Sequence, residues 1–308
     1  MAAENKPKLL VVLGPTASGK TGLAIRLAQQ FGGEIISADS MQIYRGLDIG
    51  TAKATAAEQA AVPHHLIDIR DPDQLFSVAE YCELAHETIQ KITARGKLPI
   101  LAGGTGLYLS SVLDGIHFSD EPEDGGIRAR LAEEAEHLGD AAMYEKLQRI
   151  DPETARGIHP NNRKRVLRAL ELYEKTGQTM SDQRRCSRPD QRPYDALVLG
   201  LNYPDREQLY EKIGIRVDQM LTLGLLEEAK LVFDHRDQWI TAAQAIGYKE
   251  LFPVFEGTGS LDSCIAQLKQ ATRNYAKRQL TWFRRMQETI WLDAGNPHPE
   301  ELVQQFLS

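Results

Sequence analysis

The sequence has little cysteine and no regular metal-binding spacing. Its 308 residues include three cysteines, Cys82, Cys186 and Cys264. An odd set so widely spaced predicts neither a disulfide framework nor a zinc site. The eight histidines include the pair His64-His65, but no HExxH or CxxC pattern accompanies them. We therefore expect no structural metal cluster.

Long apolar stretches are also missing. None approaches the roughly 18 consecutive apolar residues that a membrane helix needs. The apolar run near the start is short and is followed by glycines where a signal peptide would continue. The sequence thus predicts a protein without a membrane segment that resides in the cytoplasm. Hydrophobic residues make up 42% and charged residues 26%, a composition that excludes a mainly disordered chain.

The charge is unevenly distributed along the chain. The formal net charge of −7 argues weakly against a nucleic-acid partner. Residues 156–192, the first basic stripe, nevertheless carry ten Arg/Lys against four Asp/Glu. Residues 269–285, the second basic stripe, carry six Arg/Lys and no acid, whereas residues 120–153 carry eleven acids and four bases. Either stripe could be a solvated helix face, but two of them keep a polyanion partner in consideration.

Strand and helix patterns alternate in the first hundred residues. Short apolar runs predict strands buried on both faces at residues 8–13, 34–37 and 98–102. Between them, residues 22–31 have apolar side chains at helical spacing, and Ser77 with Glu80 forms a capping box that opens a helix to about Arg95. This alternation is typical of a doubly wound α/β domain with a parallel sheet flanked by helices.

The pattern changes beyond about residue 114. Residues 120–191 lack a clear buried strand, and they predict helices at 127–138, 141–149 and 163–175. A strand pattern returns at 196–201, followed by helices at 205–223, 225–233 and 261–286 and a last short strand at 290–292. We therefore expect an α/β core formed by residues 1–115 and 192–308, interrupted by an all-helical insertion over residues 116–191.

A phosphate-binding loop follows the first predicted strand. Its residues fit the pattern G-x-x-x-x-G-K-[ST] at every fixed position, and they are Gly14, Pro15, Thr16, Ala17, Ser18, Gly19, Lys20 and Thr21. The glycines let backbone N–H groups turn toward phosphate oxygens, and the helix that follows adds its positive end. Lys20 supplies a charge, and the Thr21 hydroxyl can ligate Mg²⁺. The expected architecture is therefore a P-loop α/β core.

The loop alone leaves the phosphate compound open. It recognises a polyphosphate, not the group attached to it. A nucleotide hydrolase usually adds an acid after an apolar strand. The candidates are Asp39 and Asp68, and neither ends a persuasive hydrophobic run.

Five further motifs, taken in order with the loop, resemble those of the bacterial tRNA dimethylallyltransferase family. They are ISADSMQIYRGLDIGTAK at 36–53, VPHHLID at 62–68, GGTGLY at 103–108, HPNN at 159–162 and QAIGYKE at 244–250. The resemblance runs from the first strand to about Arg285. It implies transfer of a dimethylallyl group from dimethylallyl diphosphate to N6 of the adenine next to the anticodon on its 3′ side. It also implies Mg²⁺ as cofactor and a P-loop core with a helical insertion.

The resemblance also implies roles for individual residues. Asp39 would be the general base that takes the proton of the adenine amine, although alone it could equally be a turn or helix cap. Thr105, in a glycine-flanked turn, would aim a hydroxyl and N–H groups at the leaving diphosphate. Arg216 would clamp the diphosphate together with the phosphate loop, and Thr21 would ligate the metal. Thr105 could otherwise cap a helix, and Arg216 could be an exposed helix charge.

The resemblance implies an RNA surface as well. The partner would be the anticodon stem-loop of tRNA, bound by a monomer. The candidate tRNA-binding residues are Asp39, Ser40, Met41, Gln42, Asn161, Asn162, Arg163, Lys164, Arg165, Gln244, Gly247, Tyr248, Lys249, Arg273, Tyr275, Lys277 and Arg278. Trp282 and Phe283 are expected to be core residues instead.

Three other functions stay open at this point. A P-loop small-molecule kinase that binds ATP would explain the loop and Mg²⁺ but not the two basic stripes. An adenylate dimethylallyltransferase that acts on free nucleotide would need neither the helical insertion nor the second basic stripe. A nonenzymatic RNA-binding module would not need the intact loop together with Asp39 and Thr105.

Overall fold

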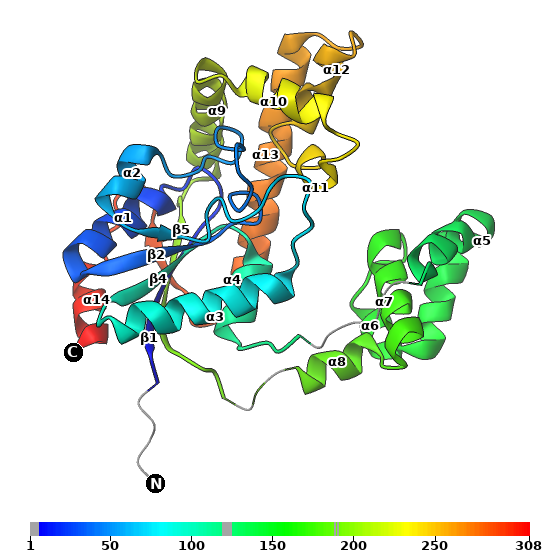
Figure 1. The fold of residues 1–308 in the computed structure, drawn as a ribbon, viewed down its shortest axis with the longest axis horizontal. Coiled ribbons are helices and arrows are strands. Elements are labelled where there is room, and N and C mark those ends of the chain that lie inside the picture. Colours follow the sequence, from blue (N-terminus) through cyan, green and yellow to red (C-terminus); the bar gives the residue numbers. More distant parts are fainter. Residues whose placement is uncertain (1–5, 119–124, 188, 190) are drawn as a thin grey trace. The chain divides into compact units, whose positions relative to one another are not determined.

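The computed structural model describes residues 6–118, 125–187, 189 and 191–308. The chain divides into two compact units (Figure 1). The core unit comprises Met1–Leu113 and Arg192–Ser308, and the helical unit comprises Asp114–Gln191. Each unit has a hydrophobic core of its own.

The core unit is built on a six-stranded sheet. The strands are β1 (Lys8–Leu13), β2 (Gly33–Ala38), β3 (His64–His65), β4 (Leu98–Gly103), β5 (Asp195–Asn202) and β6 (Ile290–Asp293). They pair in the order β3-β2-β4-β1-β5-β6, and every pair is parallel. The predicted parallel sheet is thus confirmed, and the two-residue strand β3 is the one that the sequence pattern did not indicate.

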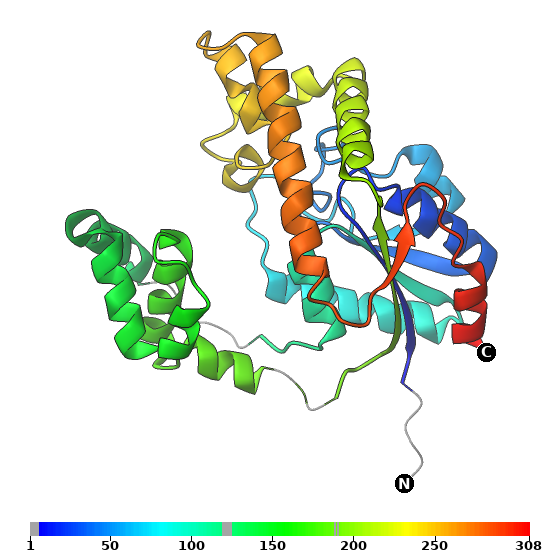
Figure 2. The same cartoon turned by 180° about the vertical axis from the view of Figure 1, so that it is seen from behind.

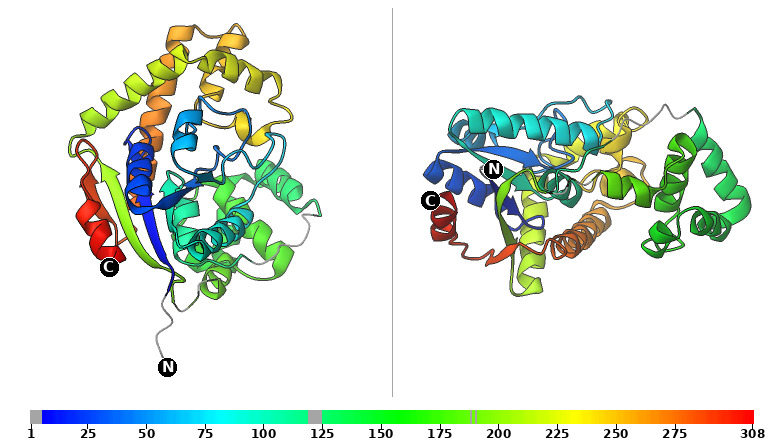
Figure 3. Two further views of the ribbon diagram at one scale, coloured as in Figure 1. Left: turned by 60° about the vertical axis from the view of Figure 1, so that its left-hand side comes forward. Right: turned by 90° about the horizontal axis from the view of Figure 1, so that it is seen from below.

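Helices cover both faces of this sheet. Alternate residues of β1 face opposite ways, so that Leu9 and Val11 pack on one face while Leu10 and Val12 pack on the other. The first face carries α3 (Val78–Ala94) and α4 (Gly106–Leu113), and the second carries α1 (Lys20–Phe31) and α14 (Glu300–Leu307) (Figures 1 and 3). The Ser77 capping box that opens α3 is present as predicted.

The described part of the core unit has seven further helices, and six of them pack around a hydrophobic cluster of their own. They are α2 (Ala56–Ala61), α9 (Arg206–Thr222), α10 (Leu225–Asp234), α11 (Ile240–Ala243), the 3-10 helix η1 (Lys249–Leu251), α12 (Phe252–Phe255) and α13 (Leu261–Phe283). All but α2 contribute to the cluster, and so does the chain that follows β2, through Ile43, Tyr44 and Leu47. Helix α13 runs from beside α12 down to the sheet (Figure 2).

The helical unit contains four helices among its described residues. They are α5 (Ile127–Ile150), α6 (Pro152–Arg156), α7 (Arg163–Thr176) and α8 (Met180–Cys186). Gly139 leaves the helical conformation at φ 82° and ψ 163°, so α5 consists of two helices at the positions expected from the sequence. The buried carboxylate of Glu171 on α7 pairs with Arg128 and Lys175, and these hydrogen bonds lower its pKa to about 2 although burial opposes the shift.

The described helices include none with both the length and the apolar surface needed to cross a membrane. In the same part of the chain, no three His, Cys, Asp or Glu side chains come together as a set of metal ligands.

Candidate active site

The predicted site residues converge at one edge of the sheet. The phosphate loop follows β1, Asp39 follows β2, and Thr105 lies just beyond β4. These three strands are neighbours in the order β2-β4-β1 and run parallel, so their carboxyl ends meet at the same edge. This edge is where ligands bind in open α/β sheets.

The phosphate loop has the tight backbone that its glycines predicted. A Cβ atom on Gly14 would lie 2.6 Å from Ser18 Oγ, so no side chain fits there. Ala17 and Gly19 have φ angles of 64° and 80°, and Gly19 caps the start of α1. The first amides of α1 have no partner within the helix, and together with its positive end they form an anion site.

Two cations and one carboxylate interact at this site. Burial and, to a lesser extent, the charge of Arg216 lower the pKa of Lys20 to about 8, although the charge of Asp39 acts in the opposite direction. Burial also lowers the pKa of Arg216, which Asp39 again opposes. Helix α9 therefore brings Arg216 close to the loop, as the resemblance implied. Because two positive charges face one negative charge, the site favours an added anion.

A pocket opens beside these groups, and its lining includes Lys20, Thr21, Asp39, Gln42 and His64. Among the lining residues, Thr21 offers a hydroxyl oxygen and Asp39 offers carboxylate oxygens. Mg²⁺ prefers oxygen ligands and usually keeps several waters besides one or two protein groups and substrate phosphates. The donor set therefore fits Mg²⁺ held mainly by a bound diphosphate.

His64 is a member of this pocket that the sequence analysis did not assign to the site. Its Nδ1 lies 2.8 Å from the carbonyl oxygen of Val62, and burial lowers its pKa. A neutral ring whose Nδ1–H donates to Val62 has an acceptor at Nε2, and this buried atom has no partner among the described residues. Its only sequence signal was its place in the VPHHLID motif.

The hydrogen bonds of Thr105 correct one prediction. The Thr105 N–H donates to the Ala38 carbonyl at 3.0 Å, and its hydroxyl oxygen accepts from the Ser40 N–H at 3.0 Å. The Thr105 N–H, which was expected to bind the anion, is therefore already engaged. The hydroxyl proton donates to Ser40 Oγ at a long 3.4 Å and can turn toward a ligand. The same bonds hold the chain beside Asp39, whose Oδ1 accepts from the Met41 N–H at 2.9 Å.

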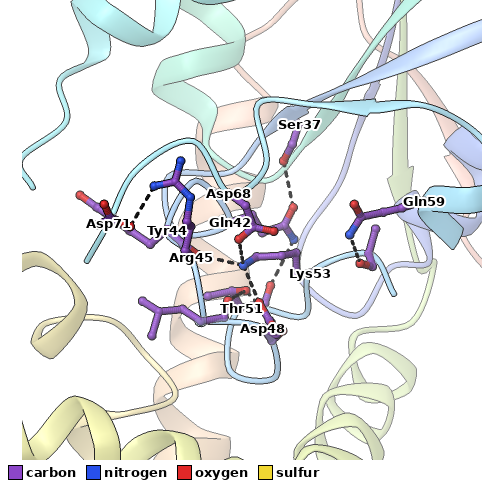
Figure 4. A network of polar contacts seen from close by, with 12 residues as sticks. Ser37, Gln42, Tyr44, Arg45, Asp48, Thr51, Lys53, Gln59, Asp68 and Asp71 are labelled. Atoms are coloured by element: carbon purple, nitrogen blue, oxygen red, sulfur yellow. Dashed lines mark hydrogen bonds and ion pairs between the residues drawn. The ribbon is translucent and has the colours of Figure 1, made fainter. Parts of the chain in front are cut away.

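Gln42 is held by its own loop (Figure 4). Its Nε2 donates to the carbonyls of Thr51 and Ala52 at 3.2 and 3.1 Å, and its Oε1 accepts from Ser37 at 2.9 Å. Both amide hydrogens are thus used inside the protein. If Gln42 contacts a base as predicted, only its Oε1 can take part without breaking these bonds.

A buried lysine, Lys53, holds the loop after β2 in place. The Lys53 side chain is only 3% exposed, and its ammonium binds Asp48 at 2.5 Å, Asp68 at 2.6 Å and the Tyr44 carbonyl at 2.8 Å (Figure 4). Asp68 is therefore an ion-pair partner of Lys53, which leaves Asp39 as the acid at the phosphate loop.

Glu228 on α10 binds the backbone of this loop at residues 48–50. Its carboxylate accepts the backbone N–H groups of Asp48, Ile49 and Gly50 at 2.8–2.9 Å and the Tyr248 hydroxyl at 2.8 Å. Gly50 is packed so tightly that an added Cβ would lie 2.5 Å from the Tyr248 ring. We call this group of residues the Glu228 latch.

The latch corrects part of the predicted RNA surface. Gly247 and Tyr248 are buried, and their packing against Gly50 gives them a role inside the protein and not in direct RNA contact. Gln244 and Lys249 of the same motif are exposed. Of the four predicted residues in this motif, these two are therefore the ones with side chains open to a partner.

The predicted RNA residues of the helical unit also divide into two kinds. Asn162 caps α7, and Arg163 pairs with Asp140 and Glu136 on α5. Asn161, Lys164 and Arg165 are exposed, and no ion pair of the two cations occurs within the described residues. The free positive charge of this segment thus lies on Lys164 and Arg165.

On α13, Lys277 and Arg278 are exposed, whereas Arg273 is partly buried with its guanidinium 5.3 Å from the centre of the Tyr210 ring. Tyr275 faces the site instead of solvent. Burial and the Asp39 charge raise its pKa, and its side chain interacts with Thr105 and Gln279. The prediction that Phe283 is a core residue is confirmed, since it is fully buried.

Comparison with known proteins agrees with this geometry. A sequence model described as IPP transferase matches residues 42–286, which is most of the chain. The chain belongs to the IPP transferase family. Two relatives named tRNA dimethylallyltransferase support this membership. The one from Bacillus cytotoxicus is 48% identical over 95% of this chain and 92% of its own length. The one from Geobacillus thermodenitrificans is 49% identical over 94% and 91%.

Solved structures of this family have the same fold. A full-length tRNA isopentenylpyrophosphate transferase from Bacillus halodurans is 43% identical and aligns with a TM-score of 0.71 over 98% of this chain and 95% of its own. A eukaryotic dimethylallyltransferase acting on tRNA is 32% identical, with a TM-score of 0.76 over 93% of this chain and 74% of its own.

The depressed pKa of Lys20 predicts how this family member binds anions. Inorganic pyrophosphate should bind less tightly as the pH rises above about 8, because free Lys20 loses its proton there and the anion favours the charged form. Below that pH the lysine is already charged, so this contribution is constant. Calorimetric titration with pyrophosphate and Mg²⁺ should show the Kd rising up to about tenfold per pH unit.

The variant Lys20→Arg is the matched control for this titration, because a guanidinium stays charged throughout. Any slope that it retains reports the ionisation of pyrophosphate itself. Equal slopes for the two proteins would show that Lys20 is not the titrating group.

Proposed function

We propose that the protein transfers a dimethylallyl group from dimethylallyl diphosphate to N6 of the adenine 3′-adjacent to the anticodon in tRNA, with release of diphosphate. The observation that carries the proposal is the meeting of an anion-binding loop, two half-buried cations and the Asp39 carboxylate at one sheet edge. Membership of the IPP transferase family and relatives named tRNA dimethylallyltransferase support it.

The adenine end of the reaction requires a base. The lone pair of N6 is delocalised into the ring, so the amine is a poor nucleophile. As N6 forms its bond to C1 of the dimethylallyl group, the bond from C1 to the diphosphate oxygen breaks, and Asp39 takes a proton from N6. General-base catalysis of this kind contributes roughly 10²–10⁴-fold.

The diphosphate end requires positive charge. As the C–O bond breaks, negative charge builds on the leaving diphosphate. The loop amides, Lys20 and Arg216 would stabilise this charge, because they are already oriented and partly shielded from water. Thr105 would contribute its hydroxyl proton while it holds Ser40, and thus the chain beside Asp39, in place.

Mg²⁺ fits this arrangement as a cofactor. The Thr21 hydroxyl would hold it together with diphosphate oxygens. When bound, the ion neutralises part of the charge on the leaving group.

The RNA partner would be the anticodon stem-loop. An adenine stacked in that loop must be extruded to reach Asp39, at a cost of a few kcal/mol. Exposed cations on α7 and α13 would offset this cost by binding phosphates, and the candidates are Lys164, Arg165, Lys277 and Arg278. One chain carries both the diphosphate site and these cations, so we propose that it acts as a monomer, in the cytoplasm where its tRNA substrate is found.

One experiment separates this function from its alternatives. Unmodified tRNA or free AMP is incubated with protein, Mg²⁺ and either dimethylallyl diphosphate or ATP, and the products are analysed by mass spectrometry. We expect one dimethylallyl group on the anticodon-loop adenine, with the diphosphate donor only. Phosphate transfer from ATP would indicate a small-molecule kinase, and modification of AMP alone would indicate an adenylate dimethylallyltransferase.

Replacing the base should separate rate from binding. Asp39→Asn keeps an oxygen that can accept the Met41 N–H, so the loop conformation should persist, but it removes the proton acceptor. We expect kcat to fall by about 10²-fold or more, with the Kd for tRNA changed less than about threefold. Single-turnover rates and filter binding measure the two quantities.

The exposed Asp73→Asn is a matched control with the same change in charge and should keep full activity. A loss of tRNA affinity as large as the loss of rate in Asp39→Asn would contradict the base assignment.

The salt dependence of tRNA binding should identify the RNA-facing cations of α7. Replacing Lys164 and Arg165 together with Ala should weaken binding and reduce the slope of log K against log salt by about 0.7–0.9 for each RNA phosphate that is no longer neutralised. Arg163→Ala should change the slope less, because its guanidinium is already paired with Asp140 and Glu136. The reverse ranking would place Arg163, and not its neighbours, on the RNA.

A further inference from the structure

Gln279 is a buried polar residue near the C-terminal end of α13, and no step of the proposed reaction uses it. Its side chain is 6% exposed. It lies more than 150 residues away in sequence from both groups that it binds. A buried amide must satisfy its hydrogen bonds within the protein, so its partners reveal what it holds.

Those partners are the two walls of the diphosphate site. Gln279 Oε1 accepts the backbone N–H of Thr16 in the phosphate loop at 2.9 Å. Its Nε2 donates to the carbonyl of Gly104, directly before Thr105, at 2.9 Å. One planar amide thus spans from the loop after β1 to the turn after β4.

The fit around this amide is tight. A Cβ added to Gly104 would lie 2.4 Å from Gln279 Nε2 and 3.7 Å from Lys20 Nζ. Glycine at position 104 therefore provides the space that the amide occupies. Tyr275, one helical turn earlier on the same face of α13, interacts with both Thr105 and Gln279.

We propose that Gln279 is a positioning residue, which sets the spacing between the phosphate loop and the Thr105 turn and ties both to α13. The inference rests on the proposed function, in which the phosphate loop and the Thr105 turn hold the diphosphate of the prenyl donor. The Thr16 N–H already donates to Gln279, so the backbone N–H groups that follow Thr16 in the phosphate loop are the ones that bind the anion. The Gln279 amide keeps these N–H groups aligned with Lys20. The exposed cations of α13, Lys277 and Arg278, lie on the same helix.

Removing the bridge should loosen the donor site and spare the RNA surface. For Gln279→Ala we expect the Kd for pyrophosphate with Mg²⁺ and the KM for dimethylallyl diphosphate to rise about 10- to 100-fold, as for a misplaced binding group. The Kd for tRNA should change less than about threefold. Gln279→Asn keeps the amide but is one methylene too short to reach both walls, so it should resemble Gln279→Ala. Gln267→Ala, at an exposed position of the same helix, is the matched control.

A double-mutant cycle tests the interaction itself. Gly104→Ala alone should weaken pyrophosphate binding, because the new methyl group pushes against the Gln279 amide. In the Gln279→Ala background the same change should have little further effect, since the amide is gone. Additive effects would show that Gly104 and Gln279 act independently and would overturn the proposal.

The readouts also separate this inference from the proposed function. Thermal unfolding checks that each variant is folded, and if Gln279→Ala does not fold, the milder Gln279→Asn decides. Pyrophosphate affinity equal to that of the wild type in a folded Gln279 variant would refute the positioning role, even if the wild type transfers the dimethylallyl group. A wild type that binds pyrophosphate but modifies no tRNA would instead contradict the proposed function.

Discussion

The closeness of two half-buried cations is the constraint on which the rest of the site depends. Lys20 and Arg216 come from different elements, burial lowers the pKa of both, and repulsion from Arg216 lowers the pKa of Lys20 as well. Asp39 compensates only part of this repulsion. A folded protein tolerates such an arrangement when a ligand relieves it, so the strain of the free site becomes affinity for an anion.

The fold brings these charges together through long-range interactions. The sheet places the phosphate loop, Asp39 and Thr105 at one edge, but α9 must supply Arg216 and α13 must supply Gln279 from the far part of the sequence. Two residues hold the loop after β2 in place: Lys53 pairs with Asp68, and Glu228 on α10 accepts the Gly50 N–H. The reacting groups therefore stand on a rigid sheet, while the residues that align them come from the surrounding helices.

The sequence predicted what depends on local pattern. The buried strands, the phosphate loop and the Ser77 capping box each follow from neighbouring residues, and all are present. Strand β3 was missed because two residues carry no periodicity, and α4 because its apolar residues show no clear helical face.

Side-chain environments were predicted less well. Tyr248 and Tyr275 were assigned to the RNA surface through the family resemblance, yet both side chains turn inward, toward Glu228 and toward Thr105. The N–H of Thr105 was expected to face the ligand, but it bonds Ala38 across the sheet edge. The orientation of each of these groups depends on a partner that is distant in sequence or on the exact path of a turn. A local sequence motif specifies neither the distant partner nor the path of the turn.

The Glu228 latch couples two segments that are distant in sequence, residues 45–53 and 244–250, so that a substitution in one affects the fit of the other. Gly50 has no room for a methyl group because the Tyr248 ring fills the space, and Gly247 approaches the backbone of Gly50 closely as well. A chimera that takes residues 45–53 from one homologue and residues 244–250 from another would combine surfaces that were never fitted to each other. Recombination or redesign in this protein therefore has to move both segments, and the acceptor on α10, as a single block.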